Sequence, residues 1–273
     1  MSDWRENPLL RRELFYRLRP QPSYRPLILL VMALCLIAVM LFYWAALESI
    51  QGAHSFRELL TATLFIEMLL VIAGAPAATA NAISKEREQR TWDLLAITLL
   101  TPQEVVLGKL FGRMLPLLLI LALGVPMVGV CVLGDPRLWL SALLGSLCVL
   151  VTLVLYSVGG LAASCFSRKT VTATALAYLF AGGWVFGPFI LWGLTSLILP
   201  NISPQQATFW LVVNPLAVVE PTMDKFSPRY YYSQPPSDAL YALSPWALLA
   251  VYSGLTVVLV WVLIATYRSW AYR

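Results

Sequence analysis

The stretch that decides the fold is ISKEREQRTWDLLAITLLTPQEVVLGKL, residues 83–110, which lies between two long apolar runs. Its first part is highly charged, from Lys85 to Arg90 and again at Asp93. These side chains are too polar for the hydrocarbon of a bilayer, so they predict a connection that leaves the membrane. The apolar runs on either side predict helices that enter it again.

The composition is that of a membrane protein. Of the 273 residues, 59% are hydrophobic and only 12% are charged, about half the charged share of an ordinary soluble domain. A helix needs about 20 apolar residues to cross the roughly 30 Å of hydrocarbon. Six spans are predicted, at about residues 27–47, 59–83, 105–133, 138–166, 171–198 and 246–267.

Those spans are expected to be α-helices, because backbone groups in lipid must pair within their own segment and the runs are too long for barrel strands. The predicted fold class is an all-α polytopic membrane protein, with one six-helix domain over residues 27–273. Four cysteines lie within or at the ends of these spans, where packing is the expected role.

The distribution of basic residues predicts the orientation. If the N-terminus is cytoplasmic, the inner segments carry 15 of the 19 Lys and Arg residues, and the outer segments carry only Arg57, Arg137, Lys225 and Arg229. The positive-inside rule therefore predicts that both termini are cytoplasmic. The protein is expected in the plasma membrane, which in a bacterium is the cytoplasmic membrane. Anionic membrane lipid accounts for the net charge of +5, so no nucleic-acid partner is expected.

Residues 1–26 are predicted to form an amphipathic helix in the cytoplasmic interface, followed by a Pro-rich linker. Asn7 and Pro8 suit the N-cap and first position of a helix. The apolar stripe of this helix consists of Leu10, Leu14, Phe15 and Leu18. Arginines lie on the other side, as in interfacial helices. A solvated basic tail is the alternative, and the regular stripe argues against it.

The last outer connection, about residues 199–245, contains a second apolar piece, ATFWLVVNPLAVV at 207–219. It is too short to span a membrane, and Asn214-Pro215 interrupts it. We predict a re-entrant or interfacial segment there.

The connection at residues 84–104 combines three features. Trp92, Leu95 and Leu99 recur at helical spacing and predict a short crosswise helix. Thr101 and Glu104 then form a capping box that begins the next span. An exposed apolar helix rimmed by charge is typical of a docking surface. A solvated helix end would explain the charges, but not the apolar residues that follow.

Motifs for catalysis are missing from the sequence. His54 is the only histidine, which excludes a multi-histidine metal site. No nucleophile elbow occurs, and Leu110 follows Gly108-Lys109 where a Walker loop needs Ser or Thr. We expect no enzymatic activity and no cofactor or metal bound by this chain. Glu67 is the one carboxylate well inside a span, and it either lines a polar path or hydrogen-bonds a neighbouring helix.

The order KEREQRTWDLLAITLLTPQEVVLGK, together with NPLLRREL near the N-terminus, six spans and the long last outer loop, resembles the ATP-binding-cassette transporter permeases of the type-2 exporter class. The resemblance covers nearly the full chain, although such permeases often have Gly at the position of Arg90. It implies a membrane subunit without its own ATPase domain. The residues expected to couple to a separate ATPase are Glu86, Glu88, Arg90, Thr91, Trp92, Leu95 and Leu99.

The resemblance also implies that ATP and magnesium bind to that cytoplasmic ATPase subunit, and that two permease protomers, identical or different, form the path. The sequence therefore favours an ATP-driven exporter permease. A membrane scaffold or assembly factor without transport is the alternative, and a membrane-embedded enzyme ranks third. Spans with hydroxyls and few charges favour an amphiphilic cargo.

Overall fold

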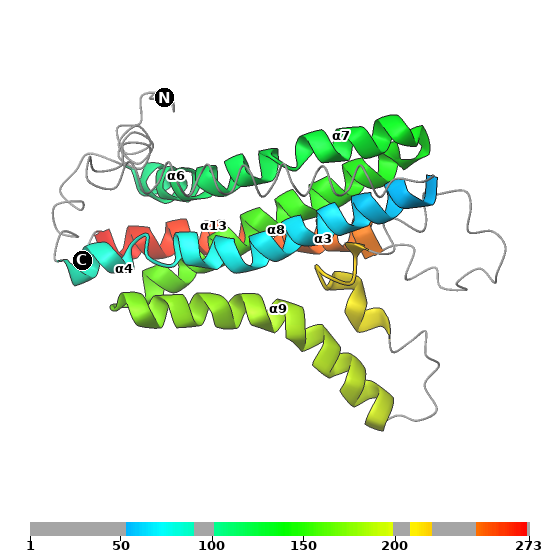
Figure 1. Ribbon diagram of the computed structural model, residues 1–273. Coiled ribbons are helices and arrows are strands. Elements are labelled where there is room, and N and C mark those ends of the chain that lie inside the picture. The colour runs from blue at the N-terminus through cyan, green and yellow to red at the C-terminus, as the bar shows by residue number, and fades with distance from the viewer. Residues whose placement is uncertain (1–52, 90–100, 199–207, 220–243, 272–273) are drawn as a thin grey trace.

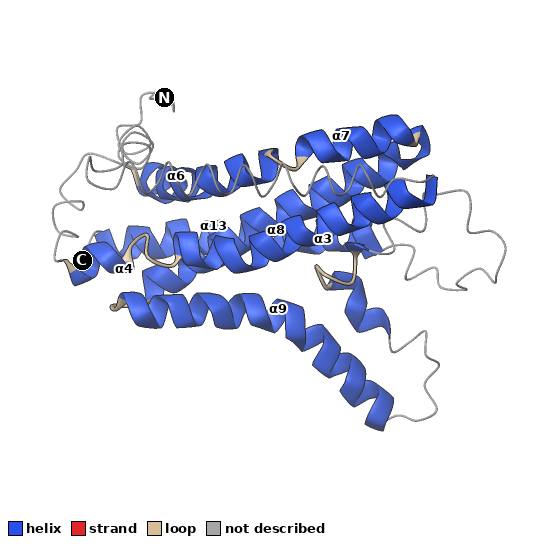
Figure 2. Cartoon of the chain, in the orientation of Figure 1, coloured by secondary structure: helices blue, strands red, loops and turns tan. Residues whose placement is uncertain are grey.

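The computed structural model describes residues 53–89, 101–198, 208–219 and 244–271. All regular structure in these ranges is helical (Figure 2). Five stretches are long and apolar enough to cross a membrane, namely Phe56–Glu88, Gln103–Gly134, Pro136–Phe166, Thr170–Thr195 and Pro245–Thr266. The all-α class and the polytopic membrane character are thereby supported.

Three predicted elements lie outside the described residues. They are the first span at 27–47, the interfacial helix with Leu10, Leu14, Phe15 and Leu18, and the short crosswise helix with Trp92, Leu95 and Leu99. The structure therefore supports five of the six predicted spans, and the span at 27–47 stays a prediction.

The long helices run alongside one another (Figure 1). Their bounds are α3 Ala53–Thr79, α4 Ser84–Glu88, α6 Pro102–Ala122, α7 Val125–Gly134, α8 Trp139–Phe166, α9 Thr170–Ile198 and α13 Ser244–Ala271, with 3-10 turns η3 Pro136–Leu138 and η4 Thr208–Val213. In Figure 1, α6 and α7 lie end to end along one side of the bundle, and α9 lies on the opposite side.

Helix α8 forms the centre of the described bundle. It packs against α3, α6, α9 and α13. Every residue from Leu155 to Leu161 is buried, and this run covers almost two turns, so all sides of the helix are enclosed there.

Glycines allow α3 to approach α8 closely. A Cβ on Gly145 would overlap the side chain of Leu64, and a Cβ on Gly160 would overlap the hydroxyl of Thr79. The Gly160 Cβ would also lie 3.4 Å from the Cα of Pro76. Small residues at a membrane helix contact permit this packing of backbone against side chain.

The third span, predicted at 105–133, is supported over Gln103–Gly134 and consists of two helices. Helix α6 ends at Ala122 and α7 begins at Val125, with a short loop between them that Figure 2 shows. Pro126 has no N–H to donate to Ala122 four residues earlier, and its ring crowds that carbonyl, so the ladder stops there. We call Leu123–Gly124 the α6–α7 break.

The second span also differs from its predicted bounds. Helix α3 begins at Ala53, six residues before the predicted start, so His54 belongs to its first turn rather than to a loop. The helix ends at Thr79, and a turn separates it from α4. The charged residues therefore lie on a separate short helix that follows a turn.

The segment at 208–219 does not span, as predicted. It forms the 3-10 helix η4, followed by a hydrogen-bonded turn in which the Val218 N–H donates to the Asn214 carbonyl. The 3-10 helix packs against α9 and α13. The buried side chain of Asn214 donates to the Val185 carbonyl at 2.7 Å and accepts from the Leu216 N–H at 2.9 Å. Tyr252 on α13 donates to the Val213 carbonyl at 3.0 Å. The depth of the 208–219 segment in a membrane stays a prediction.

Helix α9 bends in its second half and leaves the bundle (Figure 1). Pro188 lies inside this helix, where it removes one hydrogen bond and favours a kink. Beyond the bend, large apolar side chains such as Ile190 and Leu197 are exposed. This surface is apolar enough to face lipid.

Substituting Gly160→Ala tests the α3–α8 contact. The new methyl group overlaps Thr79, so we expect the free energy of unfolding to fall by about 1–3 kcal/mol, the usual cost of overpacking. Thermal unfolding in detergent measures this change. Gly254→Ala on α13 is the matched control, because nothing lies within 4 Å of its added Cβ. Equal loss in both variants would contradict the contact.

Candidate functional site

The charged residues after α3 form a folded joint, which we call the α3–α4 joint, residues 80–88. The N–H of Ala80 donates to the Pro76 carbonyl at 2.9 Å, and that of Ala82 donates to the Thr79 carbonyl at 3.0 Å. The chain thus turns immediately after α3 before α4 begins at Ser84.

Ser164 of α8 caps the start of α4. Its Oγ accepts hydrogen bonds from the N–H groups of Ile83 at 2.8 Å and Ser84 at 2.9 Å. The Oγ of Ser84 in turn donates to the Ala80 carbonyl at 3.0 Å. The first N–H groups of a helix have no partner within it, and here a serine about 80 residues away supplies one.

Lys109 of α6 is fully buried and reaches the same joint. Its Nζ lies 2.5 Å from the Glu86 Oε1 and donates to the Ala82 carbonyl at 3.2 Å. The Glu86 side chain is 24% exposed. A buried ammonium group is costly unless it is paired, so this ion pair and the carbonyl fix α6 to the joint.

Two arginines bind carbonyls at helix ends. Arg87 donates to the Cys165 carbonyl at 2.7 Å, one residue before α8 ends. Arg113 of α6 donates to the Ala78 carbonyl at 3.2 Å, one residue before α3 ends. The final carbonyls of a helix lack intrahelical donors and carry partial negative charge, so both contacts are favourable.

The joint also contacts the beginning of α9. Glu88 is exposed, and its Oε2 accepts from the N–H of Thr170 at 3.4 Å. Thr174 donates to the Asn81 Oδ1 at 3.3 Å. The α3–α4 joint therefore connects α3 to α6, α8 and α9 at one end of the bundle.

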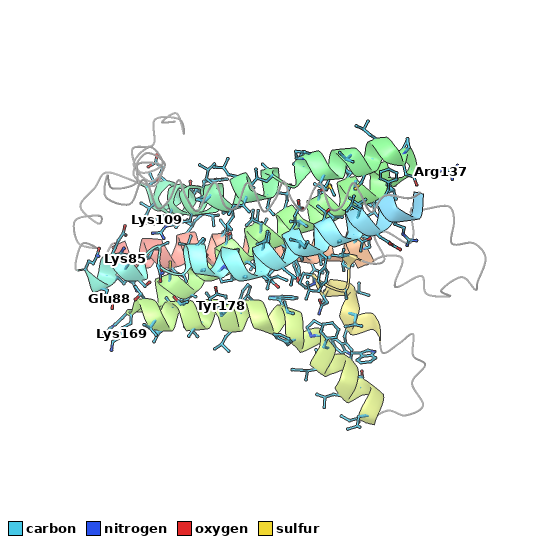
Figure 3. All side chains as sticks on the ribbon, viewed as in Figure 1. Lys85, Glu88, Lys109, Arg137, Lys169 and Tyr178 are labelled. Carbon is cyan, nitrogen blue, oxygen red and sulfur yellow. The ribbon has the colours of Figure 1, made fainter. Side chains whose placement is uncertain are left out.

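The charged residues labelled in Figure 3 lie at the two ends of the bundle. Figure 3 places Lys85, Glu88, Lys109 and Lys169 at one end and Arg137 at the opposite end. This arrangement matches the distribution that the basic residues predict.

The predicted capping box at the start of α6 is confirmed. The Oγ1 of Thr101 accepts from the N–H of Glu104 at 3.4 Å, and the Glu104 Oε2 accepts from the N–H of Thr101 at 2.9 Å. Pro102 occupies the first turn. The segment 90–100 thus follows a fixed α4 and precedes a capped α6.

The structure brings two of the predicted coupling residues together in the joint. Glu88 is exposed, as expected, but Glu86 is not a free surface charge, because Lys109 binds it. Charge reversal at Glu86 would therefore break an ion pair, whereas charge reversal at Glu88 would change an exposed side chain. The other predicted coupling residues, Arg90, Thr91, Trp92, Leu95 and Leu99, lie outside the described residues.

Sequence reasoning missed the partners of the joint. Lys109 and Arg113 stand four residues apart inside a predicted span, and a cation at that depth requires a partner. That depth is the signal by which the sequence could have indicated both partners. Ser164 gives no such signal, since serine is common in membrane helices.

Glu67 lies elsewhere, on α3. Its side chain is 9% exposed and lies against Gly124 at the α6–α7 break. It makes no hydrogen bond or ion pair within the described part of the chain. The structure thus shows no hydrogen bond to a neighbouring helix, and the path-lining alternative stays a prediction.

The chemistry of the joint is structural rather than reactive. Its groups form ion pairs and hydrogen bonds that fix helix ends. In the ranges that the structure describes, no group of three or more His, Cys, Asp or Glu side chains is arranged to hold a metal ion. The joint is a candidate for transmitting force.

Comparison with protein-family models finds no match for this chain, and comparison with curated proteins finds none either. The site therefore has to be interpreted from its own geometry.

Substituting Lys109→Met tests the buried ion pair. Removing one partner of a fully buried pair costs about 3–5 kcal/mol. Glu86 keeps access to water, so we expect a smaller loss, about 2 kcal/mol, in the free energy of unfolding. Lys85→Met is the control, because Lys85 is exposed. Adding Glu86→Gln to Lys109→Met should recover part of the lost stability. If the losses of the two single variants simply add up in the double variant, the pairing is contradicted.

Proposed function

We propose that this chain is the permease subunit of an ATP-driven exporter, similar to the type-2 ATP-binding-cassette class, and that a separate cytoplasmic ATPase drives it through residues 84–104. The observation that carries this proposal is the α3–α4 joint. It attaches a charged, partly exposed helix firmly to the ends of α3, α6, α8 and α9.

Such attachment is what a transmitting element needs. The segment 90–100 leaves α4 and enters α6 at a capping box, so a force on this segment acts on two helices with fixed ends. A loop with loose ends would absorb the force instead.

Magnitudes support this role. Moving a two-state equilibrium from 1:99 to 99:1 requires about 5.5 kcal/mol of differential binding. Each hydrogen bond of the joint contributes about 1 kcal/mol net, and several of them join it to other helices. The stabilisation of the joint is therefore of the same order of magnitude as the free energy that the ATPase must supply to switch the membrane domain.

The orientation follows from the charges. The end that carries Lys85, Lys109 and Lys169 is the cytoplasmic one under the positive-inside rule, and Arg137 lies at the outer end. In this orientation Glu88 faces the cytoplasm, where the proposed ATPase would bind.

We place the path between two copies of the subunit. In the described bundle the interior is filled by α8, which is enclosed on all sides near Tyr156. A second protomer, identical or different, would supply the other wall. The spans contain hydroxyls and few charges, which suits an amphiphilic cargo better than a highly charged one.

Charge reversal at Glu88→Lys tests the coupling. Glu88 is exposed, so thermal unfolding should stay unchanged, because exposed charges contribute little to stability. The variant is purified with its native ATPase and reconstituted in vesicles. We expect its stimulation of ATP turnover to fall several-fold. Arg137→Glu is the matched control, because it reverses an exposed charge at the opposite end.

Trp92→Ala extends the test to the predicted crosswise helix. Unchanged ATP turnover in both Glu88→Lys and Trp92→Ala, or failure of any ATPase to purify with the chain, would refute the proposal. Binding of a partner without any effect on ATP turnover would favour the scaffold alternative.

A further inference from the structure

Glu67 is the only charged residue between Glu58 and Lys85. Glu58 lies nine residues before it, about 13 Å along α3, and the helix continues for twelve residues beyond it to Thr79, about 18 Å. Its side chain is 9% exposed. It therefore lies deep in the span, where an ionised carboxylate without a partner is costly.

The carboxyl group points at the α6–α7 break. A Cβ on Gly124 would overlap the Glu67 Oε1 and would lie 3.0 Å from its Cδ. Gly124 has φ −77° and ψ −24°, which any residue adopts. Glycine at this position is thus explained by the space that the carboxyl group occupies.

The break offers backbone carbonyls to the carboxyl group. Gly124 donates to the Leu121 carbonyl at 2.9 Å, and that carbonyl would lie 3.3 Å from a Cβ on Gly124. The end of α6 carries partial negative charge and the start of α7 carries partial positive charge, so the two helix ends oppose each other at the break. Glu67 makes no hydrogen bond or ion pair among the described residues. An ionised carboxylate there lacks a partner, whereas a protonated carboxyl group can donate a hydrogen bond to a carbonyl.

Compensating cations are distant in the described ranges. Arg113 on α6 and Arg137 beyond α7 are 11 and 13 residues from Gly124, about 16 Å or more along a helix. On α3 itself, Arg57 is ten residues from Glu67, about 15 Å. The other ionisable groups on the helices packed against α3 are Glu104 and Lys109 on α6, Cys131 on α7, Cys148, Tyr156 and Cys165 on α8, and Tyr178 on α9.

We propose that Glu67 and the α6–α7 break form a proton-binding site within the membrane. The carboxylate takes one proton from the aqueous phase, and the resulting O–H donates to a backbone carbonyl at the end of α6. Loss of the proton leaves a buried carboxylate without a partner, which favours its movement away from Gly124 and loosens the contact between α3 and the break. This site requires no ATPase and stands apart from the exporter proposal.

Dicyclohexylcarbodiimide tests the site, because this apolar reagent modifies protonated carboxyl groups within membranes. The full-length protein in phospholipid vesicles is labelled at a series of pH values, and modified residues are identified by mass spectrometry. We expect labelling at Glu67, with a rate that falls roughly tenfold per pH unit once most of the carboxyl groups have lost their proton.

Two variants sharpen the test. Glu67→Gln should remove the label. Gly124→Ala should change the labelling rate several-fold, because its methyl group displaces the carboxyl group while the backbone conformation suits alanine. Gly129→Ala on α7 is the matched control, with nothing within 4 Å of its Cβ, and should label like the unmodified protein.

Absence of label at Glu67, or labelling that does not depend on pH, would overturn the proposal. Protection by sodium at constant pH would also overturn it in favour of a metal-cation site. None of these measurements involves the ATPase, so they do not depend on whether the exporter proposal holds.

Discussion

A bilayer offers no hydrogen-bond partners, so each polar group that enters this helical bundle must find its partner in the protein. The buried ammonium of Lys109 shows the consequence most directly. It binds Glu86 and the Ala82 carbonyl, and both lie beyond the end of α3. The turn after α3 therefore folds back onto α6 instead of extending into water. The same requirement places Ser164 at the first N–H groups of α4.

Residues 208–219, the described part of the connection between α9 and α13, obey the same constraint. The side chain of Asn214 bonds to the Val185 carbonyl, and Tyr252 of α13 bonds to the Val213 carbonyl. Non-helical backbone at membrane depth is tolerated only where protein encloses it. Glu67 makes no such bond among the described residues, although backbone carbonyls of the α6–α7 break lie beside it. A group left in this state responds readily to its protonation.

Stiffness and compliance are distributed unevenly. The end with the α3–α4 joint is tied by an ion pair and by hydrogen bonds between helices. The opposite half contains the α6–α7 break and the bend of α9 near Pro188, where hydrogen bonds of the helical ladder are missing. A displacement that begins at the tied end therefore moves helices as units, and the breaks are where their angles change most easily.

The sequence by itself determined the all-α class, five of the spans to within a few residues, the capping box at Thr101 and the short segment at 208–219 that does not span. These features depend on apolar run length and on neighbours within four residues, which are local properties. Tertiary structure alone decided that Ser164 caps α4, that Lys109 binds Glu86 and that Glu67 faces Gly124. Those pairs are 23 to 80 residues apart, and helix packing, which periodicity does not encode, brings them together.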